Sequence, residues 1–276
     1  MRIVNNNHRH CAVFAAALAA CPPCAVAESL PLWEIGAGAA AISFPDYRGS
    51  GNQHRYLLPV PTFVYRGDLF QVDRQKIRGL IYKGKQVEIE VSINGSVPVR
   101  SNTARQGMPD LDPTFEIGPT LNVTLAENLH SKLSLRLPAR AVIASDFRSV
   151  QNAGILANPN VNLDIKSFYG WQLGLVAGVL FGDKKYHQHF YGIAPAYALP
   201  ERPAYRAPGG YSGLQFIAAL SRRFESFHAV GFVKYDVING ASFESSPLVA
   251  RRNNLSVGFA LTLPLLQSSV RVERSD

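Results

Sequence analysis

Residues 255–263 alternate between large apolar side chains and small or polar ones almost without error. A period of two predicts a β-strand with one apolar face and one polar face. The same alternation recurs between Gly-, Pro-, Asn- and Asp-containing breaks along most of the chain, which predicts about twelve strands. These strands span residues 32–44, 54–66, 68–83, 86–98, 113–126, 130–144, 153–165, 168–181, 185–196, 211–224, 227–239 and 252–264.

Two architectures produce such alternation: a soluble sandwich that buries the apolar faces, and a membrane barrel that turns them toward lipid. The predicted strands are roughly 12 to 16 residues long, whereas strands of globular proteins peak near ~5–6 residues. No run reaches the ~18 apolar residues of a transmembrane helix. The sequence therefore predicts an all-β fold, a closed transmembrane antiparallel β-barrel of about twelve strands, although ten or fourteen strands fit the same pattern.

Aromatic residues lie at several predicted strand ends, where rings of a membrane barrel form interfacial girdles. These residues are Trp33, Phe44, Tyr56, Tyr65, Phe168, Tyr169, Phe181 and Tyr191. The Gly- and Pro-rich stretches 99–112 and 198–211 are predicted to be longer loops.

The first residues have the features of a secretory signal: a positive start, an apolar stretch at 11–20 and an A-x-A site that ends at Ala27. We expect residues 1–27 to be a signal peptide cleaved before Glu28, and residues 28–276 to be the barrel domain. A competing interpretation is lipidation at Cys21, which follows Leu-Ala-Ala. All three cysteines precede Glu28, so cleavage there leaves no disulfide framework.

The formal net charge of +8 comes from basic residues that are scattered along the chain. Scattered charge on an exported chain argues against a nucleic-acid partner. The sequence contains no nucleophile elbow, zinc-protease helix or phosphate loop, so it predicts neither an enzyme nor a cofactor. His187 and His189 share a face of the predicted strand 185–196, but without a third ligand they predict no metal site.

Eight charged residues lie on the polar faces of predicted strands and would line the barrel lumen. They are Glu88, Glu90, Glu116, Lys132, Arg136, Arg140, Lys234 and Asp236. Because an isolated buried charge is costly, a narrow lumen would have to pair them. Two interpretations stay open: an interior plugged by charge pairs, and a polar pore that admits small solutes.

Seven short phrases, in this order along the chain, resemble the MipA/OmpV family of Gram-negative outer membranes. They are LWEIGAG at 32–38, PDYRGS at 45–50, LPVP at 58–61, VYRGD at 64–68, YHQHFYGI at 186–193, YRAPGGYSG at 205–213 and SSPLV at 245–249. Within them, Arg66-Gly67-Asp68 is predicted to form a tight hairpin rather than an adhesion motif.

The resemblance implies an outer-membrane β-barrel that is exported by its signal peptide and contacts outer-membrane lipid. It also implies a scaffold for murein enzymes, namely a lytic murein transglycosylase and a bifunctional penicillin-binding protein that synthesises murein. The alternative is a small porin-like channel for polar solutes. An outer-membrane hydrolase and a lipidated periplasmic β-protein are further alternatives, and the family offers no catalytic residues to carry over.

Overall fold

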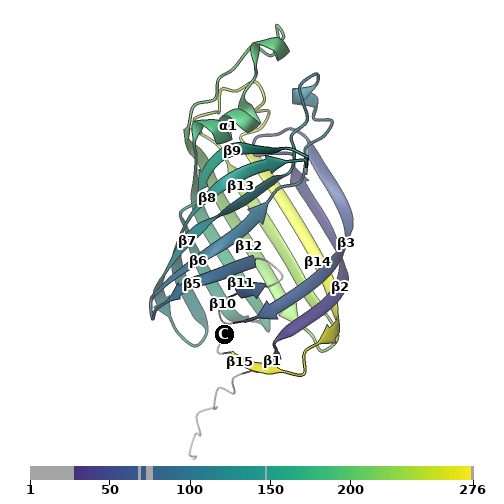
Figure 1. Cartoon of the computed structure of the whole chain (residues 1–276), viewed down its shortest axis with the longest axis vertical. Coiled ribbons are helices and arrows are strands. Elements are labelled where there is room, and N and C mark those ends of the chain that lie inside the picture. The colour runs from purple at the N-terminus through teal and green to yellow at the C-terminus, as the bar shows by residue number, and fades with distance from the viewer. Residues whose placement is uncertain (1–27, 68–69, 73–76, 147, 275–276) are drawn as a thin grey trace, which may run out of the picture.

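The computed structural model describes residues 28–67, 70–72, 77–146 and 148–274 (Figure 1). In these residues a single sheet contains the strands β2 to β14, each antiparallel to its neighbours. The barrel strands are β2 (Trp33–Pro45), β3 (Gln53–Arg66), β4 (Phe70–Val72), β5 (Ile77–Lys83), β6 (Val87–Gly95), β7 (Thr114–Glu127), β8 (Ser131–Ser145), β9 (Val150–Ala157), β10 (Asn160–Phe168), β11 (Trp171–Gly182), β12 (Gly210–Arg223), β13 (His228–Val237) and β14 (Asn253–Gln267).

The sheet closes on itself. Strand β8 pairs with both β9 and β10, and β11 also pairs with both, so β9 and β10 are two halves of one long strand. The break falls at Asn158 and Pro159, where proline cannot donate a ladder hydrogen bond. The thirteen labelled strands therefore form a barrel of twelve, and β14 pairs with β2 to close the seam. The predicted fold class is confirmed.

Two of the predicted strands are wrong. One is divided into two strands and the other is a helix, so the number of barrel strands is still twelve. Residues 68–83 contribute two short strands, β4 and β5, instead of one long strand. The predicted strand 185–196 is instead the helix α1 (Lys184–Tyr191), followed by the 3-10 turn η2 (Pro195–Tyr197). Asp183 caps this helix by accepting a hydrogen bond from the backbone N–H of Tyr186 at 2.8 Å.

The predicted hairpin after β3 is present, because Tyr65 pairs with Val72 and Arg66 with Gln71 across it. Asp68 lies outside the described residues.

Burial is inverted relative to a soluble protein. On β14 the outward residues Phe259 and Leu263 are 50 % and 51 % exposed, whereas the inward Asn254 and Thr262 are 7 % and 6 % exposed. The same contrast runs through the other long strands, where the buried positions include many polar side chains. A sandwich would bury the opposite set, so the apolar outer face requires lipid as its solvent. No helix in the described part of the chain has the length and hydropathy needed to cross a membrane.

The two ends of the barrel differ (Figure 1). One end carries long connections: residues 96–113 with the 3-10 turn η1 (Thr103–Arg105), residues 183–209 with α1, and residues 238–252. The other end has short turns and a separate two-stranded sheet of β1 (Glu28–Pro31) and β15 (Arg271–Arg274). In outer-membrane barrels the short turns face the periplasm and the long loops face outward.

Most of the predicted girdle residues lie on the outer surface, but three do not. Phe44 and Tyr56 alternate onto the inner face, where their rings stack at 5.3 Å. Tyr191 is buried among the long loops. At the short-turn end, Trp171 and Phe224 form an aromatic pair at 6.0 Å.

Candidate functional site

Charged side chains on the inner wall pair along neighbouring strands. Glu90 on β6 is fully buried, and its Oε1 lies 3.0 Å from Nη2 of Arg136 on β8. The intervening strand β7 contributes Asn122, whose Oδ1 accepts a hydrogen bond from Arg136 Nε at 3.0 Å. A carboxylate without solvent is tolerable only when paired in this way.

A second group lies nearer the long-loop end of the same wall. Arg140 on β8 approaches Glu116 on β7 with 3.6 Å between Nη1 and Oε2. The same guanidinium also donates to Ser92 Oγ on β6 at 3.2 Å. These contacts join three strands by polar side chains across the inner surface.

The third group includes a residue from a loop. Arg48, in the connection between β2 and β3, places its Nε 3.0 Å from Oδ1 of Asp236 on β13. It also donates to the backbone carbonyl of Ser212 at 2.7 Å. Lys234 contacts the other oxygen of Asp236 at 3.2 Å, so a carboxylate that is 1 % exposed has two cations. Arg48 thus ties a loop to the inside of the barrel.

The structure pairs six of the eight predicted lumen charges with one another. The other two, Glu88 and Lys132, lie toward the short-turn end, where Lys132 contacts the exposed Glu127 at 3.5 Å. Sequence reasoning missed Glu34, which is 2 % exposed and contacts Arg66 at 2.8 Å and Arg223 at 3.3 Å. Glu34 is in phase with the inward Gly and Ala positions of β2, and this alternation could have identified it as a lumen residue.

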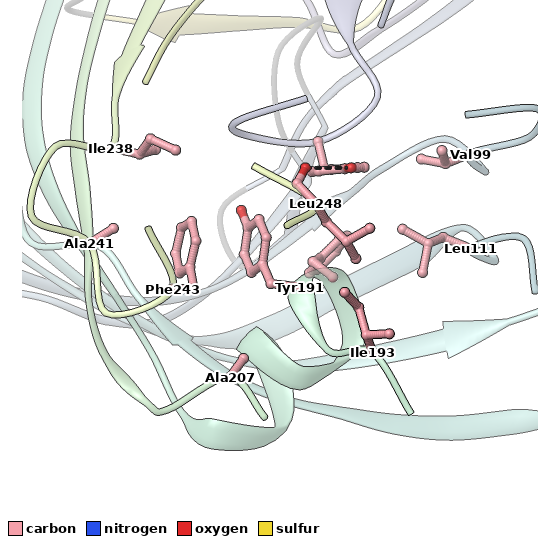
Figure 2. Packing of buried hydrophobic residues seen from close by; sticks show 11 residues of the cluster. Val99, Leu111, Tyr191, Ile193, Ala207, Ile238, Ala241, Phe243 and Leu248 are labelled. Carbon is pink, nitrogen blue, oxygen red and sulfur yellow. Dashed lines mark hydrogen bonds between the residues drawn. The ribbon is translucent and has the colours of Figure 1, made fainter. Parts of the chain in front are cut away.

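The long connections pack into a small apolar core, which we call the loop cap (Figure 2). It consists of Tyr47, Val99, Leu111, Phe190, Tyr191, Ile193, Ala207, Ile238, Ala241, Phe243 and Leu248. Tyr191 and Phe243 stack face to face with centroids 3.6 Å apart. The Tyr47 hydroxyl donates to the carbonyl of Leu248 at 2.9 Å, and burial raises the pKa of Tyr47 to about 12. The long connections thus have a packed apolar interior of their own.

The two histidines lie on α1, so the prediction that they share a strand face is wrong. His187 is fully buried, with Nδ1 2.6 Å from the Pro208 carbonyl and Nε2 2.6 Å from Ser212 Oγ. A carbonyl can only accept, so Nδ1 carries the proton and Nε2 accepts from the serine. Burial lowers the pKa of both His187 and His189, which keeps the imidazoles neutral.

This serine–histidine pair is sealed from solvent, since Ser212 is 1 % exposed. A substrate cannot reach the hydroxyl in this arrangement, and the pair anchors α1 to the start of β12. The described residues contain no cluster of three or more His, Cys, Asp or Glu side chains that could hold a metal ion.

Four of the sequence phrases that carried the family resemblance meet at the loop cap. They lie at 45–50, 186–193, 205–213 and 245–249 and supply Tyr47, Tyr191, Ala207 and Leu248 to its core. Their separation along the chain concealed this contact. The predicted cleavage position lies at the boundary of the described residues: Glu28 begins β1, whereas Ala27 and Cys21 lie outside them.

Comparisons with known proteins add a family and a set of similar barrels. A family model described as MltA-interacting protein MipA matches residues 37–263. The NanC porin aligns with a TM-score of 0.39 at 7 % identity, over 84 % of this chain and 100 % of its own. The CymD monoaromatic hydrocarbon channel aligns with a TM-score of 0.34 at 10 % identity, over 86 % and 89 %. Outer membrane phospholipase A from Escherichia coli aligns with a TM-score of 0.32 at 9 % identity, over 82 % and 92 %. No curated protein sequence matches the chain.

Proposed function

The chain belongs to the MipA family of MltA-interacting proteins, and on that basis we propose that this outer-membrane β-barrel is an interaction scaffold for murein-processing enzymes. The partners would be a lytic murein transglycosylase and a bifunctional penicillin-binding protein. Residues 1–27 would export the chain and be removed before Glu28.

The observation that supports a scaffold over a channel is the burial of the lumen charges. Glu90 and Asp236 are 0 % and 1 % exposed although both lie on the inner wall. A conducting pore would keep such carboxylates in water, as the interiors of porins do. Arg48, which reaches Asp236 from a loop, and the packed loop cap would further hinder passage at the long-loop end.

A small channel is the second candidate, and a specific observation favours it. Lys234 and Arg136 keep 30 % and 23 % exposure of their side chains inside the wall. Space around these cations could pass small anions if the loop cap opens. The burial of Ser212 and His187 argues against a catalytic role for this pair.

A murein enzyme would meet the barrel from the periplasm, which places its contact at the short-turn end. Two turns there present unusually exposed apolar side chains: Leu129 is 81 % exposed and Tyr169 is 90 % exposed. The turns are neighbours, because Lys166 donates a backbone hydrogen bond to His130 at 2.8 Å. Exposed apolar groups beside polar turn residues are typical of protein contact surfaces.

The test is a pull-down of the full chain from detergent-solubilised envelopes, with identification of the captured murein enzymes. The double variant Leu129→Ser and Tyr169→Ser should lose the capture. The matched control is Leu199→Ser, an exposed apolar residue of the opposite end, which should retain it. Equal capture by all three forms would refute docking at the short-turn end, and capture of no murein enzyme by the unmodified chain would refute the scaffold.

Two further measurements address the alternatives. Steady conductance of the purified barrel in planar bilayers would favour the channel over the scaffold. The intact mass of the mature protein distinguishes a start at Glu28 from an acylated Cys21.

A further inference from the structure

The outer wall of the barrel contains a groove where β10 to β13 run side by side. Its volume is about 490 Å³ and its lining is almost entirely apolar. Two small residues, Ala177 on β11 and Ala218 on β12, lie in it, and larger outward side chains surround them. Ala218 pairs with Leu175 on one side and with Val233 on the other, and Ala177 pairs with Phe216. The groove thus exists because two methyl groups stand among larger side chains on the lipid-facing surface.

The outward face of β12 continues from this groove toward the short-turn end. It passes from Ala218 to Leu220 and then to Arg222, the last residue but one of the strand. Arg222 lies about 14 Å in depth from the midpoint of β12, at ~3.4 Å per residue and a tilt of ~40°. This depth is just beyond the half-height of an apolar band ~25 Å tall. Arg222 is therefore at the level of the lipid headgroups, while the groove lies in the hydrocarbon.

Aromatic rings hold the guanidinium of Arg222. Its Cζ lies 4.8 Å from the ring centroid of Phe224 and 5.9 Å from that of Trp171, within the range of cation–π contacts. Among the described residues, no carboxylate forms an ion pair with Arg222, and this includes Glu225 in the adjoining turn. The charge of an oriented, exposed cation at the membrane surface is left for a partner outside the chain.

We propose that Arg222 and the groove together bind one anionic phospholipid of the periplasmic leaflet. The phosphate would lie on Arg222, and one acyl chain would follow Leu220 into the groove beside Ala177 and Ala218. Charge complementarity favours this occupant, because arginine matches phosphate geometry and a basic residue at the surface attracts an anionic headgroup. The spacing favours it too, since the cation and the groove lie on one outward face with the apolar Leu220 between them.

The first test examines the headgroup. In the full barrel with Trp33→Phe, Trp171 is the only remaining tryptophan. Phosphatidylglycerol with brominated acyl chains is mixed into phosphatidylcholine vesicles, and quenching of Trp171 gives the preference for the anionic lipid. We expect a preference of about fivefold, as for one basic residue at an anionic surface, and its loss in Arg222→Gln. The matched control is Arg271→Gln, an exposed cation of the same end, which should keep the preference.

The second test examines the groove. Native mass spectrometry of the barrel released from detergent should detect one retained phosphatidylglycerol. Ala218→Phe fills the groove and should lose this lipid. Ala41→Phe, at an exposed outward position of β2 opposite Phe259, should retain it. A heat-modifiable shift in gel mobility checks that each variant forms a barrel.

Three outcomes would overturn the proposal. The first is an unchanged lipid preference in Arg222→Gln. The second is an equal loss of preference in Arg271→Gln, which would assign the effect to the general positive charge of that end. The third is retention of phosphatidylglycerol by Ala218→Phe at the level of the unmodified chain, which would place the acyl chain elsewhere.

Discussion

A charge placed on the outer face of β14 should cost stability according to its depth in the membrane. Leu261 lies one residue from the middle of β14 (Asn253–Gln267) and is 43 % exposed on the apolar face. At ~3.4 Å per residue and a tilt of ~40°, it sits within about 3 Å of the level of the strand's midpoint. Leu255 shares the face but lies five residues from the middle, about 13 Å away in depth and so at the edge of an apolar band ~25 Å tall.

Arginine at the bilayer midplane of a barrel costs ~2–4 kcal/mol and near the interface ~0–1 kcal/mol. Leu261→Arg should therefore destabilise the barrel by roughly 2–4 kcal/mol and Leu255→Arg by at most about 1 kcal/mol. The assay is equilibrium unfolding by denaturant in lipid vesicles, followed by tryptophan fluorescence. Equal costs at the two positions would refute the idea that lipid surrounds this face. The inward Thr262 is unsuitable as a control, because it packs against the backbone at Gly38.

Three further predictions concern the lumen and the loop cap. Glu90→Ala should destabilise the barrel by up to about 3 kcal/mol, the low end for a broken buried pair, because Arg136 keeps 23 % exposure; denaturant unfolding in vesicles measures this. Phe243→Ala should cost about 3–5 kcal/mol of local stability, so the loops should become sensitive to protease while the heat-modifiable barrel band remains. Burial lowers the pKa of His187 below its ordinary 6.5, so the unfolded loops bind the proton more strongly. The loop cap should be fully stable above that pH and lose stability as the pH falls below it, which protease sensitivity against pH would show.

Matched variants separate these effects from general damage. Lys132→Ala breaks an exposed pair and should cost at most ~1 kcal/mol; a loss as large as that of Glu90→Ala would contradict the argument from burial. Leu199→Ala, in an exposed part of the same loop as α1, should leave protease sensitivity unchanged. His187→Asn should weaken the pH dependence and leave the part that His189 contributes, and an unaltered profile would assign it to other groups.

The fold class could be predicted because a strand with one face toward lipid alternates regularly between apolar and polar residues. Alternation of the kind seen from Leu255 to Leu263 needs no knowledge of partners in space, and the structure confirms it residue by residue. The helix α1 was not predicted, because its eight residues also fit a period of two. The signal for a helix was a single side chain, the cap at Asp183. Residues 68–83 were predicted as one strand and not as the hairpin of β4 and β5, because no proline or paired glycine separates these two strands in the sequence.

The pairing inside the barrel was only partly predictable. The polar face of each strand identified Glu90, Arg136 and Asp236 as inward candidates, but their partners depend on register, which alternation alone does not fix. Arg48 could not be found at all, because it reaches the lumen from a loop. The loop cap was hidden for the same reason: its members are far apart in sequence and follow no period.

The small sheet of β1 and β15 bears on the order in which the parts of the barrel fold. It joins residue 28 to residue 274, and the neighbouring seam joins β2 to β14. Both contacts join segments that are far apart in the sequence, and such contacts form slowly because the entropy of closing a long loop is lost before the contact stabilises it. We therefore expect the sheet of β1 and β15 to form after the local hairpins of the barrel.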